Sequence, residues 1–143
     1  MTNERLLELA FEARERAYTP YSNWKVGAAL LCKDGTVFLG CNIENSGFSS
    51  TVCAERTAIF KAISEGYYDF EKIAVVGGDE TEGSKGYCTP CGVCRQVMSE
   101  FCDPDTFEVI CGKTVDDYKV FTLRQMIPEC NFIAASDGYG FKV

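Results

Sequence analysis

Residues 25–41 read KVGAALLCKDGTVFLGC and have the pattern of a β-hairpin. The part over residues 25–32 is almost entirely apolar, which is typical of a buried strand. Lys33-Asp34-Gly35 follows and carries the Asp-Gly signal of a tight turn between two strands. Residues 36–41 then predict the partner strand. We therefore expect this hairpin to lie in the main sheet of the protein.

The segments before and after the hairpin predict helices and further strands. Leucine and alanine recur at helical spacing over residues 4–17, before a stop at Pro20. The later part of the chain predicts, in order, a helix over 54–65, a strand over 72–76, a helix over 91–101, a strand over 106–111 and a helical turn over 123–126. This order predicts an α/β fold in which helices flank a mixed sheet. Since no linker or repeat interrupts the chain, we expect one domain over residues 1–143.

The composition excludes several chemistries. The chain has 143 residues, nine cysteines and no histidine, so it can form neither a Ser-His-Asp triad nor a histidine metal site. A metal site must use cysteine, carboxylate or carbonyl groups, and a proton shuttle must be a side chain other than histidine, or water. The net charge of −7 argues against nucleic acid and against an anionic membrane as the main partner.

The cysteines and the N-terminus predict a cytoplasmic protein. The longest apolar run, residues 26–32, is far shorter than the ~20 residues of a membrane span, and the charged N-terminus does not resemble a signal peptide. In the cytoplasm, cysteines are more often thiols, metal ligands or catalytic groups than disulfides. Five of them fall in or near apolar segments and are expected to be small buried hydrophobic residues: Cys32, Cys41, Cys102, Cys111 and Cys130.

Two junctions between a loop and a predicted helix carry the candidate chemistry. Cys53-Ala54-Glu55 begins the second helix, and Cys91 and Cys94 begin the third at Cys-x-x-Cys spacing after Pro90. The free N–H groups and the dipole at a helix start stabilise thiolates. Three thiolates with an open fourth position match catalytic zinc better than structural zinc, which closes all four positions.

Glu55 is the candidate proton shuttle. It lies on the same helical turn as Cys53, where it can reach a water on the open position without being a ligand. Zinc lowers the pKa of a bound water toward ~7, so Glu55 can take the proton of that water and pass it on. Three thiolates outweigh the charge of one Zn²⁺, and either Arg56 or Arg95 can donate hydrogen bonds to the sulfurs.

Two other interpretations of these cysteines stay open. The Cys-x-x-Cys pair can be a redox dithiol. Alternatively, Cys88 can join Cys53, Cys91 and Cys94 in a closed structural Cys₄ site, which leaves Glu55 without a role. The function that matches the closed site is a zinc-binding structural or interaction protein without catalysis.

Taken together, the motifs resemble those of the zinc-dependent cytidine deaminases. Residues 53–55 and 90–96 (PCGVCRQ) are similar to the zinc motifs of that family, residues 18–30 to its N-terminal segment and residues 40–45 (GCNIEN) to its nucleoside-binding segment. The resemblance covers about residues 4–128. It implies a three-layer α/β/α sandwich with a mixed central sheet of about five strands. The absence of histidine points to the small type with three cysteine ligands and one Zn²⁺ per chain, which in this family is a homotetramer.

The resemblance also implies roles for individual residues. It makes Cys53, Cys91 and Cys94 zinc ligands, Glu55 the catalytic proton shuttle, Asn42, Glu44, Trp24 and Ala54 substrate-binding residues, and Arg56 a contact to the ligand sulfurs. Asn42 and Glu44 would bind the ribose hydroxyls, and Trp24 would pack against the pyrimidine where the family usually has phenylalanine. Cys88 adds a thiol close to the site. Phe132, which lies one residue further along than usual, is a possible aromatic side chain lent to the site of a neighbouring subunit.

The function implied by the resemblance is hydrolytic deamination of cytidine and 2′-deoxycytidine to uridine and 2′-deoxyuridine with release of ammonia, a step of pyrimidine salvage. Water activated by zinc would attack C4 of the ring, while Glu55 moves the proton to N3 and then to the leaving amine. One alternative is a deaminase of another aminopyrimidine, such as blasticidin S, although residues 42–45 favour cytidine. Another is a polynucleotide deaminase, against which the negative net charge counts.

Overall fold

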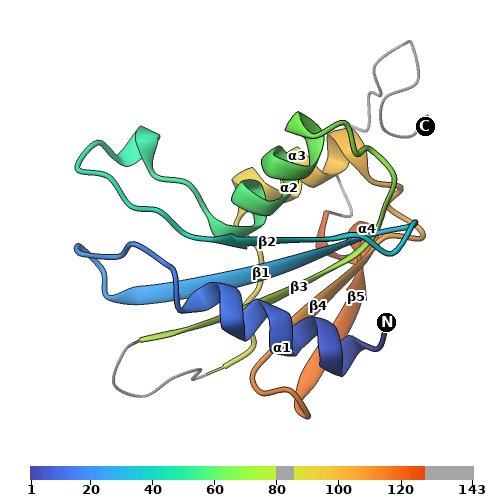
Figure 1. The fold of residues 1–143 in the computed structure, drawn as a ribbon, viewed down its shortest axis with the longest axis horizontal. Helices are drawn as coiled ribbons and strands as arrows, with labels where there is room; N and C mark the ends of the chain where they lie inside the picture. Colours follow the sequence, from blue (N-terminus) through green and yellow to red (C-terminus); the bar gives the residue numbers. More distant parts are fainter. Residues whose placement is uncertain (80–85, 128–143) are drawn as a thin grey trace.

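A five-stranded mixed sheet forms the centre of the computed structural model, which describes residues 1–79 and 86–127 (Figure 1). The strand order is β2-β1-β3-β4-β5. The strands are β1 (Trp24–Cys32), β2 (Val37–Cys41), β3 (Phe70–Asp79), β4 (Glu108–Gly112) and β5 (Tyr118–Thr122). β3 and β4 are parallel, whereas the other neighbouring strands are antiparallel.

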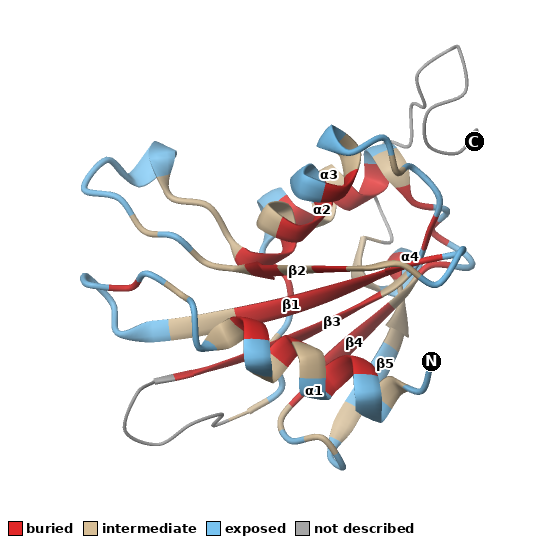
Figure 2. Ribbon diagram, in the orientation of Figure 1, coloured by how far each residue is buried: buried red, intermediate tan, exposed pale blue. Residues whose placement is uncertain are grey.

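The predicted hairpin forms β1 and β2. Its register places Leu30 opposite Phe38 and Gly27 opposite Cys41. β1 also pairs with β3 on its other edge, so it is an interior strand of the sheet. Residues 27–32 are all buried (Figure 2), as expected for a strand whose two faces are both covered.

Helices cover both faces of the sheet, which confirms the three-layer α/β/α sandwich (Figure 1). The helices are α1 (Asn3–Arg14), α2 (Ala54–Ser64), α3 (Gly92–Phe101) and α4 (Leu123–Met126), with the short 3₁₀ helix η1 (Phe48–Ser50). Leu31 packs with α1 on one face, whereas Leu30 packs with α2 and α3 on the other, because successive strand residues point to opposite faces. None of the helices in the described ranges has the length and apolar composition needed to cross a bilayer.

Some boundaries differ from the sequence prediction. β5 was not located from the sequence, because its half-exposed residues at the sheet edge lack a clear apolar pattern. β3 was predicted to end at residue 76, but it continues through Gly77 and Gly78, which pair with β1. The first helix ends at Arg14, three residues before the predicted end at residue 17.

The start of α2 lies directly against β2 because Gly40 has no side chain. A Cβ atom on Gly40 would lie 2.3 Å from the carbonyl oxygen of Ala54 and 2.6 Å from the backbone nitrogen of Ala58. Atoms in van der Waals contact do not approach so closely. The helix start that carries Cys53 and Glu55 is thereby held on the sheet.

The described cysteines are all free thiols. Cys32, Cys102 and Cys111 are buried as predicted, whereas Cys41 is half-buried because it ends the edge strand β2. Cys130 lies outside the described residues.

Candidate active site

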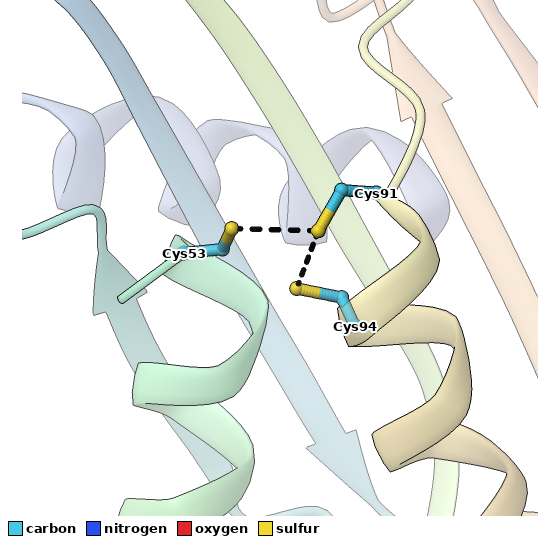
Figure 3. Close-up of side chains that lie close together, drawn as sticks. All are labelled: Cys53, Cys91 and Cys94. Atoms are coloured by element: carbon cyan, nitrogen blue, oxygen red, sulfur yellow. Dashed lines mark hydrogen bonds between the residues drawn. The ribbon is translucent and has the colours of Figure 1, made fainter. Parts of the chain in front are cut away.

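Three cysteine sulfurs from two helices meet on the side of the sheet that α2 and α3 cover (Figure 3). Cys53 is the N-cap residue of α2, Cys91 is the N-cap residue of α3, and Cys94 lies on the first turn of α3. The Cys91 Sγ atom lies 3.6 Å from the Sγ atoms of both Cys53 and Cys94. The structure thus brings together the three residues that the sequence offered as metal ligands.

The spacing of these sulfurs fits one tetrahedral zinc ion. With Zn–S bonds of about 2.3 Å, two sulfur ligands of a tetrahedral zinc lie about 3.8 Å apart, close to the 3.6 Å observed. Among the described residues, no further cysteine or carboxylate belongs to this group of mutually close ligand atoms. Three protein ligands leave one position for water or substrate, as in catalytic zinc sites.

Cys88 lies apart from the sulfur cluster, next to β3. A Cβ atom on Gly77 would lie 3.0 Å from the Cys88 Sγ atom. Burial raises the pKa of Cys88 to about 12, and the negative charge of Glu55 contributes to the rise. Cys88 therefore stays a neutral thiol. Within the described part of the chain it does not join the three sulfurs, which contradicts the alternative Cys₄ site.

Arg56 contacts the sulfur cluster and offsets its negative charge. Its Nη2 atom donates a hydrogen bond to the Cys53 Sγ atom at 3.3 Å. Hydrogen bonding from the Cys94 thiol is the largest cause that lowers the pKa of Cys53 to about 5, and Arg56 contributes in the same direction against the effect of burial. The pKa of Cys94 is raised, because its thiol keeps the shared proton. Of these two cysteines, Cys53 is therefore the one that gives up its proton more readily.

Arg95, the other arginine that the sequence offered, binds backbone carbonyl groups instead. Its Nε atom donates to the carbonyl oxygen of Pro90 at 2.8 Å, and its Nη1 atom donates to that of Met126 at 3.0 Å. These two hydrogen bonds tie the start of α3 to the end of α4. Arg56 is thus the arginine that contacts a sulfur of the cluster.

Glu55 is a buried carboxylic acid at the second position of α2. Its side chain is 3% exposed. Burial raises the pKa of Glu55 to about 7, and the negative charge of Cys53 adds to the rise, while the backbone N–H of Glu55 and the Cys94 thiol act in the opposite direction. A carboxyl group with such a pKa can both take up and release a proton near neutral pH.

Asn42 lies at the start of the loop that joins β2 to α2. Its Oδ1 atom accepts a hydrogen bond from the N–H of Val26 at 2.8 Å, and its Nδ2 atom donates to the carbonyl oxygen of Trp24 at 2.8 Å. The next residue, Ile43, forms a β-bridge to Val52, which directly precedes the first ligand cysteine. The loop is therefore fixed to β1 at one end and to the sulfur cluster at the other.

Glu44 holds the turn before β1. Its carboxylate accepts hydrogen bonds from the backbone N–H groups of Tyr21 and Ser22, at 3.0 and 3.2 Å, and from the Ser22 hydroxyl. The hydroxyl bond is the largest cause of the lowered pKa of Glu44, so the group is ionised at neutral pH. A cavity of about 320 Å³ opens beside it and is lined by Tyr21, Ser22, Glu44, Asn45, Phe48 and Thr51.

Trp24 and Ala54 lie at the beginnings of β1 and α2. Trp24 is 40% exposed, and the alternation of β1 points its indole to the side of α2 and α3, as Val26 and Ala28 do. Ala54 is fully buried between Cys53 and Glu55. Phe132 lies outside the described residues.

The sequence reasoning missed Ser22, which binds Glu44 through its hydroxyl and accepts a hydrogen bond from the N–H of Trp24 through the same oxygen. A serine in the turn after Pro20 was visible in the sequence. Its partner lies 22 residues away, so no local pattern could reveal the pair.

Comparison with known proteins places these features in a family. Residues 1–111 match the family model described as the zinc-binding region of cytidine and deoxycytidylate deaminases. The chain belongs to this deaminase family. Within it, a cytidine deaminase of Sporosarcina psychrophila is 48% identical over 128 residues, which cover 90% of each protein. A blasticidin-S deaminase of Bacillus cereus is 37% identical over 129 residues, which cover 85% of this chain and 89% of that protein.

Solved structures of the deaminase family show the same fold. The 1.6 Å crystal structure of cytidine deaminase from Burkholderia pseudomallei is 47% identical and has a TM-score of 0.83, and the match covers 92% of this chain and all of that one. Family membership makes Zn²⁺ the metal and the chain a zinc-dependent hydrolytic deaminase, and the three-sulfur cluster can hold that ion. The redox dithiol and the zinc protein without catalysis are therefore disfavoured.

Proposed function

We propose that this chain deaminates cytidine and 2′-deoxycytidine hydrolytically to uridine and 2′-deoxyuridine, with release of ammonia, as a step of pyrimidine salvage. The observation that carries the proposal is the buried Glu55 on the first turn of α2, whose N-cap residue Cys53 is one of three cysteines with sulfurs spaced for one zinc ion. The 48% identity to a protein named cytidine deaminase, over most of both chains, supports the substrate.

In this proposal Cys53, Cys91 and Cys94 hold one Zn²⁺ per chain. The bound metal supplies a water that ionises near neutral pH. Arg56 offsets the charge of the three thiolates through its hydrogen bond to Cys53 and so keeps the metal a good Lewis acid.

The Glu55 carboxylate moves the protons of the reaction. It accepts the first proton of the attacking water on a side-chain oxygen and donates it to N3 of the pyrimidine. It then takes the remaining proton of the hydroxyl group on C4 and gives it to the amine, which leaves as ammonia when the C4–N bond breaks and the C4 carbonyl forms. Burial supports this role, because the raised pKa of Glu55 brings the carboxyl closer to the pH at which it must exchange protons.

The nucleoside binds through its ribose and its ring. A carboxylate has about four acceptor positions, and Glu44 uses three of them within the chain, which leaves one for a ribose hydroxyl. Asn42 likewise keeps one N–H and one lone pair free of the two backbone bonds that it makes. Trp24 forms a wall of the pyrimidine pocket, and Ala54 lines the pocket from the start of α2.

We further propose a cytoplasmic homotetramer. Exposed apolar side chains on the described surface, which include Phe48 at 91% exposure, Phe60 and Val93, support burial against other copies. Phe132 is the proposed aromatic side chain lent to a neighbouring site. The free thiols of the eight described cysteines fit a reducing compartment. Light scattering should give four times the 15.8 kDa of one chain, and a monomer would contradict the assembly.

The decisive experiment compares E55Q with the wild type. Loss of the proton shuttle should lower kcat for cytidine by about 10³-fold, because general acid–base catalysis contributes roughly 10²–10⁴-fold. Turnover is followed by ultraviolet absorbance, and zinc content should stay at one ion per chain. E65Q, an exposed glutamate after the same helix, is the matched control. An E55Q enzyme that keeps near-normal turnover would overturn the shuttle assignment.

The similarity to blasticidin-S deaminase supports one second candidate substrate. The wild-type enzyme should show a higher kcat/KM for cytidine than for blasticidin S, because the ionised Glu44 and Asn42 can bind ribose hydroxyls. A preference for blasticidin S would favour the second candidate.

A further inference from the structure

Gly77 faces the proposed site from the middle layer of the fold. It lies on β3 opposite Val26 of β1. Val75, two residues earlier on β3, packs in the core with α2 and α3, so the two-residue alternation of the strand directs position 77 to the same side. This is also the side on which the three sulfurs meet.

The space above Gly77 is already filled by two side chains from other elements. A Cβ atom at this position would lie 3.1 Å from the Trp24 Nε1 atom and 3.0 Å from the Cys88 Sγ atom. Carbon atoms in favourable contact lie about 3.5–4.0 Å apart. A methyl group at position 77 would therefore push the indole, the thiol or both.

The indole is the part of Trp24 that such a push would move. Two hydrogen bonds fix the backbone of Trp24. Its N–H donates to Ser22 Oγ at 3.0 Å, and its carbonyl oxygen accepts from Asn42 Nδ2 at 2.8 Å. The side chain lies at the end of β1 and is 40% exposed, so it has room to rotate away from the sheet. Cys88 is more deeply buried than Trp24, so its thiol has less room to move.

We propose that Gly77 is a positioning residue for Trp24. Because position 77 has no side chain, the indole can approach β3 beside Cys88, and the position of the indole sets the width of the proposed pyrimidine pocket. The proposal rests on the proposed function for the identity of the ligand. It adds a determinant of nucleoside affinity that acts through Trp24 and does not itself touch the proton shuttle or the metal.

The first test is the G77A variant. We expect its KM for cytidine to rise about tenfold, with kcat within about twofold of the wild type, because ground-state binding is altered and the chemical step is not. Trp24 is the only tryptophan of the chain, so its fluorescence reports the indole directly. The emission of zinc-loaded G77A should shift relative to the wild type. The control is G86A, because no described atom outside the adjacent residues lies within 4 Å of a Cβ position on Gly86. This variant should change neither KM nor emission.

The second test is rescue by a smaller ring. W24F removes part of the side chain that the new methyl group displaces, so W24F/G77A should have a KM within about threefold of W24F alone, a coupling that a double-mutant cycle isolates. C88A/G77A should not restore KM. Rescue by C88A rather than by W24F would overturn the proposal, as would a W24F/G77A protein that fails to fold or bind zinc. Failure of the wild type to deaminate cytidine would overturn the proposed function, whereas unchanged emission in G77A would overturn the positioning role whatever that activity is.

Discussion

The two halves of the site hold their polar groups in different ways. The sulfur cluster and Glu55 are placed by the starts of two helices packed on the sheet, and Glu55 and Cys94 are buried there. The loop with Asn42 and Glu44 lies at the surface, and its polar side chains are paired with backbone groups of the turn and strand around residues 21–26.

The difference has an energetic consequence. In the cluster, groups that can carry negative charge lie close together, and Cys94 and Glu55 are buried, so they are stable only when a proton, Arg56 or a metal ion compensates their charge. In the loop, each charged or polar group already has partners that do not depend on a metal. We therefore expect changes in the cluster to affect metal binding and catalysis together, and changes in the loop to affect nucleoside binding alone.

The largest effect is expected from C94S, which replaces the buried cysteine of the cluster. A serine hydroxyl is a poor zinc ligand, so the variant should lose its zinc. Activity should fall by about 10³-fold or more, because several kcal/mol of transition-state stabilisation depends on the metal. The measurements are zinc content by atomic spectroscopy and cytidine turnover.

C41S is the control for this change, since Cys41 is a half-buried thiol outside the cluster. It should keep one zinc per chain and most of its activity. A C94S protein with full zinc content would contradict the assignment of the ligand.

A smaller effect is expected from E44Q in the loop. A glutamine has one acceptor oxygen in place of two and no charge, so it cannot accept all the bonds from Ser22 and Tyr21 and still bind ribose. KM for cytidine should rise about 10²-fold, the order expected when a site loses a hydrogen bond to a substrate hydroxyl. Zinc content should not change.

E71Q, which alters an exposed glutamate on β3, is the control for E44Q. A lower zinc content in E44Q would contradict the expectation that changes in the loop affect nucleoside binding alone. An equal KM for cytidine in E44Q and E71Q would contradict the role of Glu44 in nucleoside binding.

The smallest effect is expected from R56Q, which removes the guanidinium from the Cys53 sulfur. The affinity for zinc should fall about tenfold, because groups that contact metal ligands typically contribute 10–100-fold. Competition with a chelator measures this change, and KM at saturating zinc should stay close to that of the wild type.

K33Q removes an exposed lysine that pairs with Asp69 and serves as the charge-matched control. Equal zinc affinity in R56Q and K33Q would show that Arg56 does not offset the charge of the cluster.

The helices and most strands followed from the sequence because their signals are local. The apolar run and Asp-Gly turn of residues 25–41 predicted the hairpin, and the spacing of Cys91 and Cys94 placed both sulfurs on one helical turn. β5 escaped prediction because the residues of this edge strand are half-exposed and show no clear apolar alternation.

The candidate site was predictable to the extent that it is made of motifs. Residues 53–55 and 90–96 are continuous patterns, and their resemblance to a deaminase family named the metal and the shuttle. Ser22 and Gly77 are in no such motif, because their effects depend on partners brought near by the register of the sheet and the path of the loop.

The sequence by itself determined which groups were available: without histidine, the metal ligands had to be thiols, carboxylates or carbonyl groups, and the proton shuttle had to be another side chain or water. The tertiary structure alone decided which of them meet. Cys53 and Cys91 are 38 residues apart, and they come within 3.6 Å because α2 and α3 pack on the same face of the sheet. Cys88 is nearer to Cys91 in the sequence than Cys53 is, but its sulfur lies next to Gly77 of β3 and is not part of the cluster. Periodicity is a property of neighbours in sequence, whereas the distance between helix starts is set by packing of the whole core.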